Sequence, residues 1–289
     1  MIVGGRPDMI LPADPELEGA HLWSGILEKD KLEIQDHGAP FQGEGAGCIV
    51  LDLQKKHIYG VAYPTPIVFD YDMTAGTFGE GARLGPKEDI EKAITWLSPC
   101  ERVSKSPRTL FLGPAGSMYG AWSGQLFSWT PPRQEEEQTK DAKQVRILKN
   151  RIPAASERKN ADDRRAAGDG VIVESFVVGS DGRLYGGTYD GYLFASDLKT
   201  EKIVNLGKPF RQGRIRALAA SDDRIFGLCG ESTGHGRVFS YSAADGYNEI
   251  EIQGAKFRCD TLDALAVAQN GMIFIGGAGR MTALYIYKP

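Results

Sequence analysis

A short aromatic–glycine motif recurs through this chain and constrains its fold more than any other feature. In its clearest copy, residues 182–194, it reads GRLYGGTYDGYLF. Two short apolar segments joined by a glycine-containing turn predict a β-hairpin. The aromatic residue at Tyr185 is matched elsewhere at intervals of 41 to 66 residues, by Tyr59, Tyr119, Phe226 and Phe274. A unit that returns at such spacing indicates a repeat architecture.

A second aromatic follows each of these residues and marks the next strand of the unit. It stands after an apolar residue in each copy: Phe69, Phe127, Phe194, Phe239 and Tyr285. We expect the first set of aromatics to pack between neighbouring sheets, because large rings suit the pleated surface of buried strands. Stacking on a ligand is the alternative for these rings.

The repeats divide the chain into six units, and these predict an all-β fold. The units span residues 1–42, 43–85, 105–148, 169–209, 212–253 and 260–289. The first lacks an inner strand and the last lacks an outer one. We predict a single β-propeller domain over residues 1–289, built from six four-stranded blades. Seven blades are the alternative, because Met1 abuts a strand that has no preceding partner.

Two segments interrupt the strand pattern. In residues 86–104, four apolar residues have helical spacing and predict a short amphipathic helix: Ile90, Ala93, Ile94 and Leu97. Residues 131–168 are highly charged and contain one predicted outer strand, 145–148. The rest of this segment is expected to be a solvated insertion, where a protein partner could dock.

Composition excludes several classes of partner. The formal net charge is -4, which gives no indication of binding to nucleic acid or to an anionic membrane. No apolar run is long enough to cross a membrane, and the N-terminus does not resemble a secretion signal. A cytoplasmic location is the default expectation. Secretion is possible if the N-terminus is truncated.

The sequence contains none of the common metal, nucleotide or nucleophile motifs. The four cysteines are scattered without CxxC spacing, so buried free thiols are expected. The four histidines have no recurrent spacing, and no metal site is predicted. His57 falls at a turn without an acidic neighbour in the sequence. Neither a phosphate-binding loop nor a GxSxG elbow occurs, and no cofactor can be identified.

The hairpin motif followed by an Asp-rich turn resembles the broad superfamily of kelch-like and quinoprotein-like β-propellers. It is more distantly similar to the propellers that act as polysaccharide lyases and streptogramin lyases. The resemblance implies a propeller fold over most of the chain. It carries over structural positions and no catalytic residue.

The resemblance also implies where a ligand would bind. In a propeller, the loops between blades share one face with the loops between second and third strands, and that face surrounds the channel mouth. Candidate residues in the loops between blades are Glu44, Arg211, Arg214 and Arg258. Candidates in the loops between second and third strands are Tyr63, Trp122, Tyr189 and His235.

These residue types favour an acidic saccharide or another carboxylated small molecule. Arginine forms two-pronged hydrogen bonds to carboxylates. Tyr63, Trp122 and Tyr189 could stack on sugar rings or other flat apolar faces. A uronate lyase would use Arg211, Arg214 or Arg258 to neutralise the carboxylate. His235 or Tyr189 would remove the adjacent proton. The alternative is that these arginines are structural ion pairs.

We therefore expect a carbohydrate- or small-molecule-acting enzyme, with a lyase acting on a uronate-type substrate as the leading hypothesis. The alternative is a non-catalytic propeller that binds a protein partner. Substrate identity and oligomeric state do not follow from the sequence.

Overall fold

A computed structural model describes most of the predicted strands. The described residues are 2–4, 19–28, 31–63, 65–84, 107–113, 116–122, 124–131, 145–152, 171–210, 213–230, 236–250, 261–268, 270–278 and 283–288. The chain divides into two compact units. Unit 1 comprises residues 1–122 and 126–147, and unit 2 comprises residues 123–125 and 148–289.

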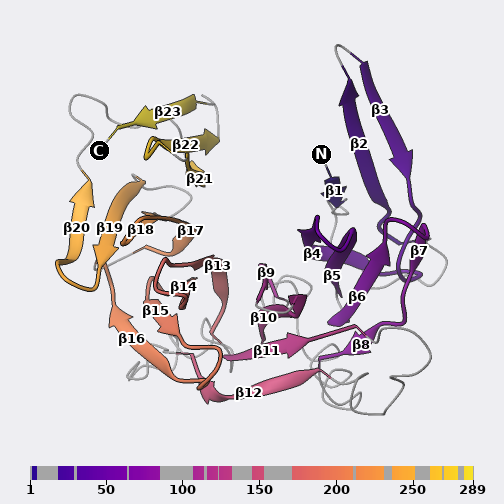
Figure 1. Cartoon of the computed structure of the whole chain (residues 1–289), viewed down its shortest axis with the longest axis horizontal. Coiled ribbons are helices and arrows are strands. Elements are labelled where there is room, and N and C mark those ends of the chain that lie inside the picture. The colour runs from indigo at the N-terminus through magenta and orange to yellow at the C-terminus, as the bar shows by residue number, and fades with distance from the viewer. Residues whose placement is uncertain are drawn as a thin grey trace, which may run out of the picture. The chain divides into compact units, whose positions relative to one another are not determined.

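The described strands form six antiparallel sheets, numbered here in chain order (Figure 1). Sheet 1 contains β1 (Ile2–Gly4), β2 (Leu22–Glu28) and β3 (Lys31–Asp36). Sheet 2 contains β4 (Gly45–Asp52), β5 (His57–Tyr63), β6 (Ile67–Asp72), β7 (Thr77–Phe78) and β8 (Ala82–Arg83). Sheet 3 contains β9 (Leu110–Leu112), β10 (Met118–Trp122), β11 (Gln125–Trp129) and β12 (Arg146–Arg151).

The remaining sheets belong to unit 2. Sheet 4 contains β13 (Val173–Val178), β14 (Leu184–Thr188), β15 (Leu193–Ser196) and β16 (Ile203–Gly207). Sheet 5 contains β17 (Ile215–Ser221), β18 (Arg224–Cys229), β19 (Arg237–Ser242) and β20 (Gly246–Ile250). Sheet 6 contains β21 (Thr261–Val267), β22 (Ile273–Ala278) and β23 (Ala283–Tyr287).

Successive strands pair with one another, so each sheet is a meander in sequence order. In unit 2 the first strands of the three sheets lie side by side, with β17 between β13 and β21. In unit 1 the first strands of sheets 2 and 3, β4 and β9, are likewise neighbours. Repeated four-stranded meanders whose first strands adjoin are the blades of a β-propeller. The all-β prediction is confirmed. The number of blades and the single domain stay predictions.

A glycine on the second strand faces a phenylalanine on the third strand in four sheets. Register pairs Gly60 with Phe69, Gly186 with Phe194 and Gly227 with Phe239. A Cβ atom placed on Gly186 would lie 2.2 Å from Cζ of Phe194. The corresponding distances to phenylalanine rings at Gly60, Gly120 and Gly227 are 2.3, 2.5 and 2.3 Å. The absence of a side chain therefore lets each ring lie directly on the neighbouring backbone.

The repeated aromatics occupy equivalent positions on the second strands. Each is paired with a first-strand residue at the same level of its sheet: Tyr59 with Val50, Tyr119 with Phe111, Tyr185 with Val177, Phe226 with Ala219 and Phe274 with Ala266. Tyr59, Tyr185 and Phe226 are buried in hydrophobic clusters. Packing, as predicted, explains these three rings.

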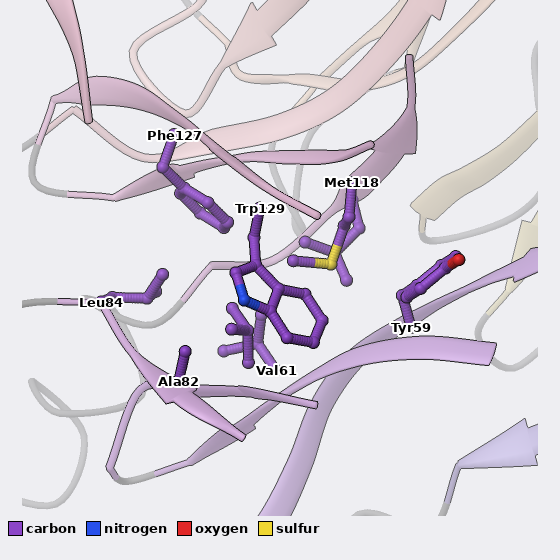
Figure 2. Close-up of a cluster of buried hydrophobic side chains, with 9 residues drawn as sticks. Tyr59, Val61, Ala82, Leu84, Met118, Phe127 and Trp129 are labelled. Carbon is purple, nitrogen blue, oxygen red and sulfur yellow. The ribbon is translucent and has the colours of Figure 1, made fainter. Parts of the chain in front are cut away.

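Unit 1 has a core in which sheets 2 and 3 meet (Figure 2). The Trp129 indole lies at its centre in the figure, with Val61 and Met118 beside it. Tyr59 meets Trp129 edge-on, with ring centroids 6.5 Å apart. Inward-facing residues from adjacent sheets therefore interlock in the way that blades of a propeller pack.

The outer strands differ in detail from the prediction. In sheet 2 the outer strand is split into β7 and β8, and both pair with β6. In sheet 3 the outer strand runs to Arg151, three residues beyond the predicted end at 148. The predicted helix in 86–104 lies outside the described residues. Most of the 131–168 insertion also lies outside them.

The first and last sheets have three strands in the described part of the chain, as expected. Each of these two sheets exposes large apolar side chains. In sheet 1 they are Trp23, Leu32 and Ile34, with Ile34 62% exposed. In sheet 6 they are Leu284 and Ile286. No helix of the described residues could span a membrane.

We predict that Gly186→Ala destabilises the protein by about 1–3 kcal/mol, because the new methyl group would overlap the Phe194 ring. Urea unfolding measures the change. In Gly186→Ala/Phe194→Leu the smaller side chain relieves the overlap, so the double variant should lose less stability than the sum of the two single changes. Additive effects would contradict the proposed Gly–Phe contact.

Burial raises the pKa of the Cys229 thiol from 9.0 to about 12. The folded protein therefore keeps this proton where the unfolded chain loses it, and the free energy of unfolding falls as pH rises above 9. Between pH 9 and 10, the decrease for Cys229→Ala should be shallower than for wild type by about 1 kcal/mol per pH unit. Urea unfolding at several pH values checks this, and equal slopes would contradict it.

Candidate functional site

Two kinds of loop meet at one end of sheet 4, which we call the loop end of unit 2. The β14–β15 hairpin tip, residues 189–192, is joined to the segment before β13 by a hydrogen bond from Tyr189 N to Ile172 O of 2.8 Å. Lys208, Gly213 and Arg214, which belong to the connection from sheet 4 to sheet 5, lie against the same hairpin. This agrees with the expectation that loops between blades share an end with loops between second and third strands.

The hairpin tip is a tight turn held by Thr188. Gly191 N donates to Thr188 O at 3.0 Å, and Tyr192 N donates to Thr188 Oγ1 at 2.9 Å. Gly191 has φ of +82°, a conformation that L side chains rarely adopt. Tyr189 therefore stands at the tip, and 42% of its surface is exposed.

Glycines allow the connection to approach the hairpin closely. A Cβ atom on Gly191 would lie 2.2 Å from Gly213 O, and one on Gly213 would lie 3.3 Å from Gly230 N. Gly230 N donates to Arg214 O at 3.1 Å. Three backbones thus stack against one another and fix the path of the chain that carries Arg214.

Arg214 and Tyr189, both predicted site residues, are brought together by this packing. The guanidinium Cζ of Arg214 lies 5.5 Å from the centre of the Tyr189 ring, a cation–π contact. One Arg214 terminal nitrogen, Nη1, lies 3.9 Å from Glu174 Oε1. That distance is beyond hydrogen-bond range. Arg214 Nε is buried and has no hydrogen-bond partner among the described residues.

Two further cation–aromatic pairs involve the same connection. Lys208 Nζ lies 4.5 Å from the centre of the Tyr192 ring. Arg237 Cζ lies 5.0 Å from the centre of the Phe210 ring. These four residues were not singled out from the sequence. Lys208 lies at the end of the predicted fourth unit and Phe210 lies in the predicted loop that follows it, but only the packing of the loops shows which ring each cation contacts.

The first strands carry charged residues at β-bulges near the loop end. A register shift between Val173 and Ser175 leaves Glu174 as the extra residue of β13. The corresponding shift in β17 leaves Arg216. Bulges redirect side chains and are enriched near functional sites. A charge that interrupts the apolar pattern of a first strand is the sequence signal that marks both residues.

The predicted site residues of unit 1 have structural roles. The Glu44 carboxylate accepts a hydrogen bond from Thr65 N, with Oε2 at 3.0 Å. The Tyr63 ring covers Gly45, where an added Cβ atom would lie 2.4 Å from the ring. Trp122 packs against the hydrophobic core of Figure 2. These contacts fix the loops of sheets 2 and 3, and whether they also touch a ligand stays a prediction.

Three predicted site residues, His235, Arg211 and Arg258, lie outside the described residues. Their roles in catalysis or substrate binding stay predictions. Within the described part of the chain, no group of three or more His, Cys, Asp or Glu side chains could hold a metal ion.

Strand pairing gives His57 the acidic neighbours that the sequence did not reveal. Its Nδ1 lies 3.4 Å from Asp70 Oδ2, and its Nε2 lies 3.9 Å from Asp72 Oδ2. Burial raises the pKa of Asp70, an effect that nearby His57 partly opposes. His57 faces Asp72 in the strand register, at the hairpin end of sheet 2 opposite Glu44. It is therefore not part of the predicted ligand face.

The Asp-rich turns also have a structural role. Asp72 Oδ1 accepts hydrogen bonds from Thr74 N and Ala75 N, and these bonds lower the pKa of Asp72. Asp197 Oδ1 accepts from Lys199 N and Thr200 N, with the same effect on its pKa. These carboxylates shape the turns between third and fourth strands.

Comparison with known proteins identifies an architecture. No protein-family model matches the chain, and no curated protein sequence matches it. Virginiamycin B lyase from Staphylococcus aureus is similar in structure, with a TM-score of 0.60, 10% identity, and coverage of 99% of this chain and 88% of that chain.

Two other similar structures have different functions. YCF48 bound to D1 peptide has a TM-score of 0.55 and 11% identity, and the match covers 93% of this chain and 72% of that chain. A chain of the nidogen–laminin complex has a TM-score of 0.51 and 12% identity, covering 89% and 82%. At such identities the likeness is one of fold alone. Together with the repeated meander sheets, it shows that this chain has the β-propeller fold.

Proposed function

We propose that the loop end of unit 2 binds a carboxylated saccharide, with Arg214 recognising the carboxylate. The observation that carries the proposal is the Arg214–Tyr189 pair. The guanidinium is fixed against an exposed ring, its contact with Glu174 is longer than a hydrogen bond, and its buried Nε has no hydrogen-bond partner in the described part of the chain. A carboxylate is the group that this planar set of donors fits best.

Tyr189 supplies the second element of recognition. Its ring is exposed at the hairpin tip, beside the guanidinium. Aromatic rings present a flat apolar surface, which suits the C–H face of a sugar. A uronate combines that face with a carboxylate on the same ring. The proposed ligand class therefore accounts for both residues.

The reaction proposed for such a ligand is β-elimination. A base would take the proton from the carbon that bears the carboxylate. The electron pair then forms a carbon–carbon double bond as the adjacent glycosidic C–O bond breaks, and the leaving oxygen takes up a proton. Arg214 would stabilise the negative charge that develops on the carboxylate. His235 or Tyr189 would be the base. The similarity in fold to virginiamycin B lyase is compatible with a lyase but supports no specific substrate.

We predict that wild-type protein binds galacturonate more tightly than neutral galactose, measured by isothermal titration calorimetry. Arg214→Ala should weaken uronate binding by about 2 kcal/mol, or roughly thirty-fold, through the loss of charged hydrogen bonds. Arg214→Lys keeps the charge but not the planar fork, so it should also bind more weakly than wild type.

Arg224→Ala is the matched control. Arg224 is at the opposite end of sheet 5, where its Nη2 pairs with Asp245 Oδ2 at 2.6 Å. Its loss should leave uronate affinity unchanged. Equal affinity of wild type for galacturonate and galactose would contradict the proposed function.

The lyase step has its own assay, the ultraviolet absorbance of the unsaturated product formed from a uronate oligosaccharide.

The close packing of Gly191, Gly213 and Gly230 yields a separate prediction about the position of Arg214. Gly191→Ala places a methyl group against Gly213 O at a positive φ, so it should displace the connection that carries Arg214. We expect a loss of about 1–3 kcal/mol in stability together with weaker uronate binding. Gly182→Ala, also at positive φ but with open space at the opposite end of sheet 4, should lose stability and retain affinity. Equal uronate affinity of Gly191→Ala and wild type would contradict the positioning role.

A further inference from the structure

The connection between sheets 4 and 5 places two cationic side chains against the tip of one hairpin. Lys208, at its start, lies over Tyr192, and Arg214, at its end, lies over Tyr189. Both rings belong to the tip of the same β14–β15 hairpin. A second cation–aromatic pair therefore lies on the same hairpin tip as the proposed carboxylate site at Arg214, and it is built from the same two segments.

The connection is anchored at its start, middle and end. Tyr247 Oη donates to Gly207 O at 3.3 Å, next to Lys208. The Phe210 ring packs edge-on against buried Phe239, with centroids 6.4 Å apart. At the end, Arg214 O accepts from Gly230 N. These contacts fix the backbone on both sides of the loop, so the two cations are presented from a defined frame.

The two cations differ in their electrostatic surroundings. Arg214 has Glu174 within 4 Å, so part of its charge is balanced. Lys208 itself is half-buried, and among the described residues it has no acidic side chain within salt-bridge distance of its ammonium group. An ammonium over an aromatic ring, with no acidic partner, attracts an anion that can approach from the loop end. A single carboxylate held by Arg214 would leave this second position unused.

We infer that this face recognises two anionic groups on one ligand, namely the carboxylates of consecutive units in an acidic oligosaccharide. This inference rests on the proposed function, because Arg214 and Tyr189 hold the first unit. Lys208 then binds the carboxylate of the second unit, whose ring lies on Tyr192. Lysine acts here as a point charge and tolerates variation in the angle of the second carboxylate.

The test compares a single uronate with its disaccharide by isothermal titration calorimetry. Wild type should bind digalacturonate at least roughly tenfold more tightly than galacturonate. Lys208→Ala should lower affinity for the disaccharide by roughly five- to thirtyfold and leave affinity for the monosaccharide unchanged. Lys208→Arg, which keeps the charge, should retain most of the preference for the disaccharide.

Lys202→Ala is the matched control, since Lys202 is an exposed lysine of the β15–β16 turn at the other end of sheet 4. It should not change either affinity. If Lys208→Ala leaves the ratio of the two affinities unchanged, or weakens both sugars equally, the two-carboxylate inference is overturned while the proposed function stands. If wild type binds neither uronate, both are overturned.

Discussion

The contact between a glycine of the second strand and a phenylalanine of the third strand is the constraint on which the repeated sheets depend. At Gly60, Gly120, Gly186 and Gly227, a ring lies where any larger residue would place its Cβ atom. The contact fixes how deeply each ring sits in its sheet. All four phenylalanines are buried, and burial of their apolar rings stabilises the sheets. Sheet 6 departs from this rule, since Ile275 stands opposite Tyr285.

The regular sheets explain how a small set of loop residues comes together as a candidate site. In a meander, alternate loops emerge at the same end, so the hairpin tip 189–192 lies at the same end as Lys208, Gly213 and Arg214. Glycines at 191, 213 and 230 then let the backbones touch. Arg214 is thereby held over Tyr189, and Lys208 over Tyr192. The scaffold sets the loop positions, while a few loop residues determine the chemistry.

The repeat pattern predicted the fold well because its signals are local. The spacing of Tyr59, Tyr185 and the related aromatics follows from strand length, and Gly182 marks a turn that only a few residue types favour. Glycine positions, apolar pairs and turn residues each constrain their own neighbourhood. They therefore located the sheets to within a few residues. The split outer strand of sheet 2 was missed because β7 and β8 are only two residues long.

The site was predicted less completely because its contacts join residues that are distant in sequence. Lys208–Tyr192 depends on the path of a connection, and His57–Asp70 depends on strand register. Trp122 was predicted from its residue type, yet it packs on a core.

A crystal structure with digalacturonate tests the central claim most directly. We predict one carboxylate hydrogen-bonded to Arg214 and the other within ion-pair distance of Lys208. Arg214 closed onto Glu174 at hydrogen-bond distance, with the sugar bound elsewhere, would contradict it.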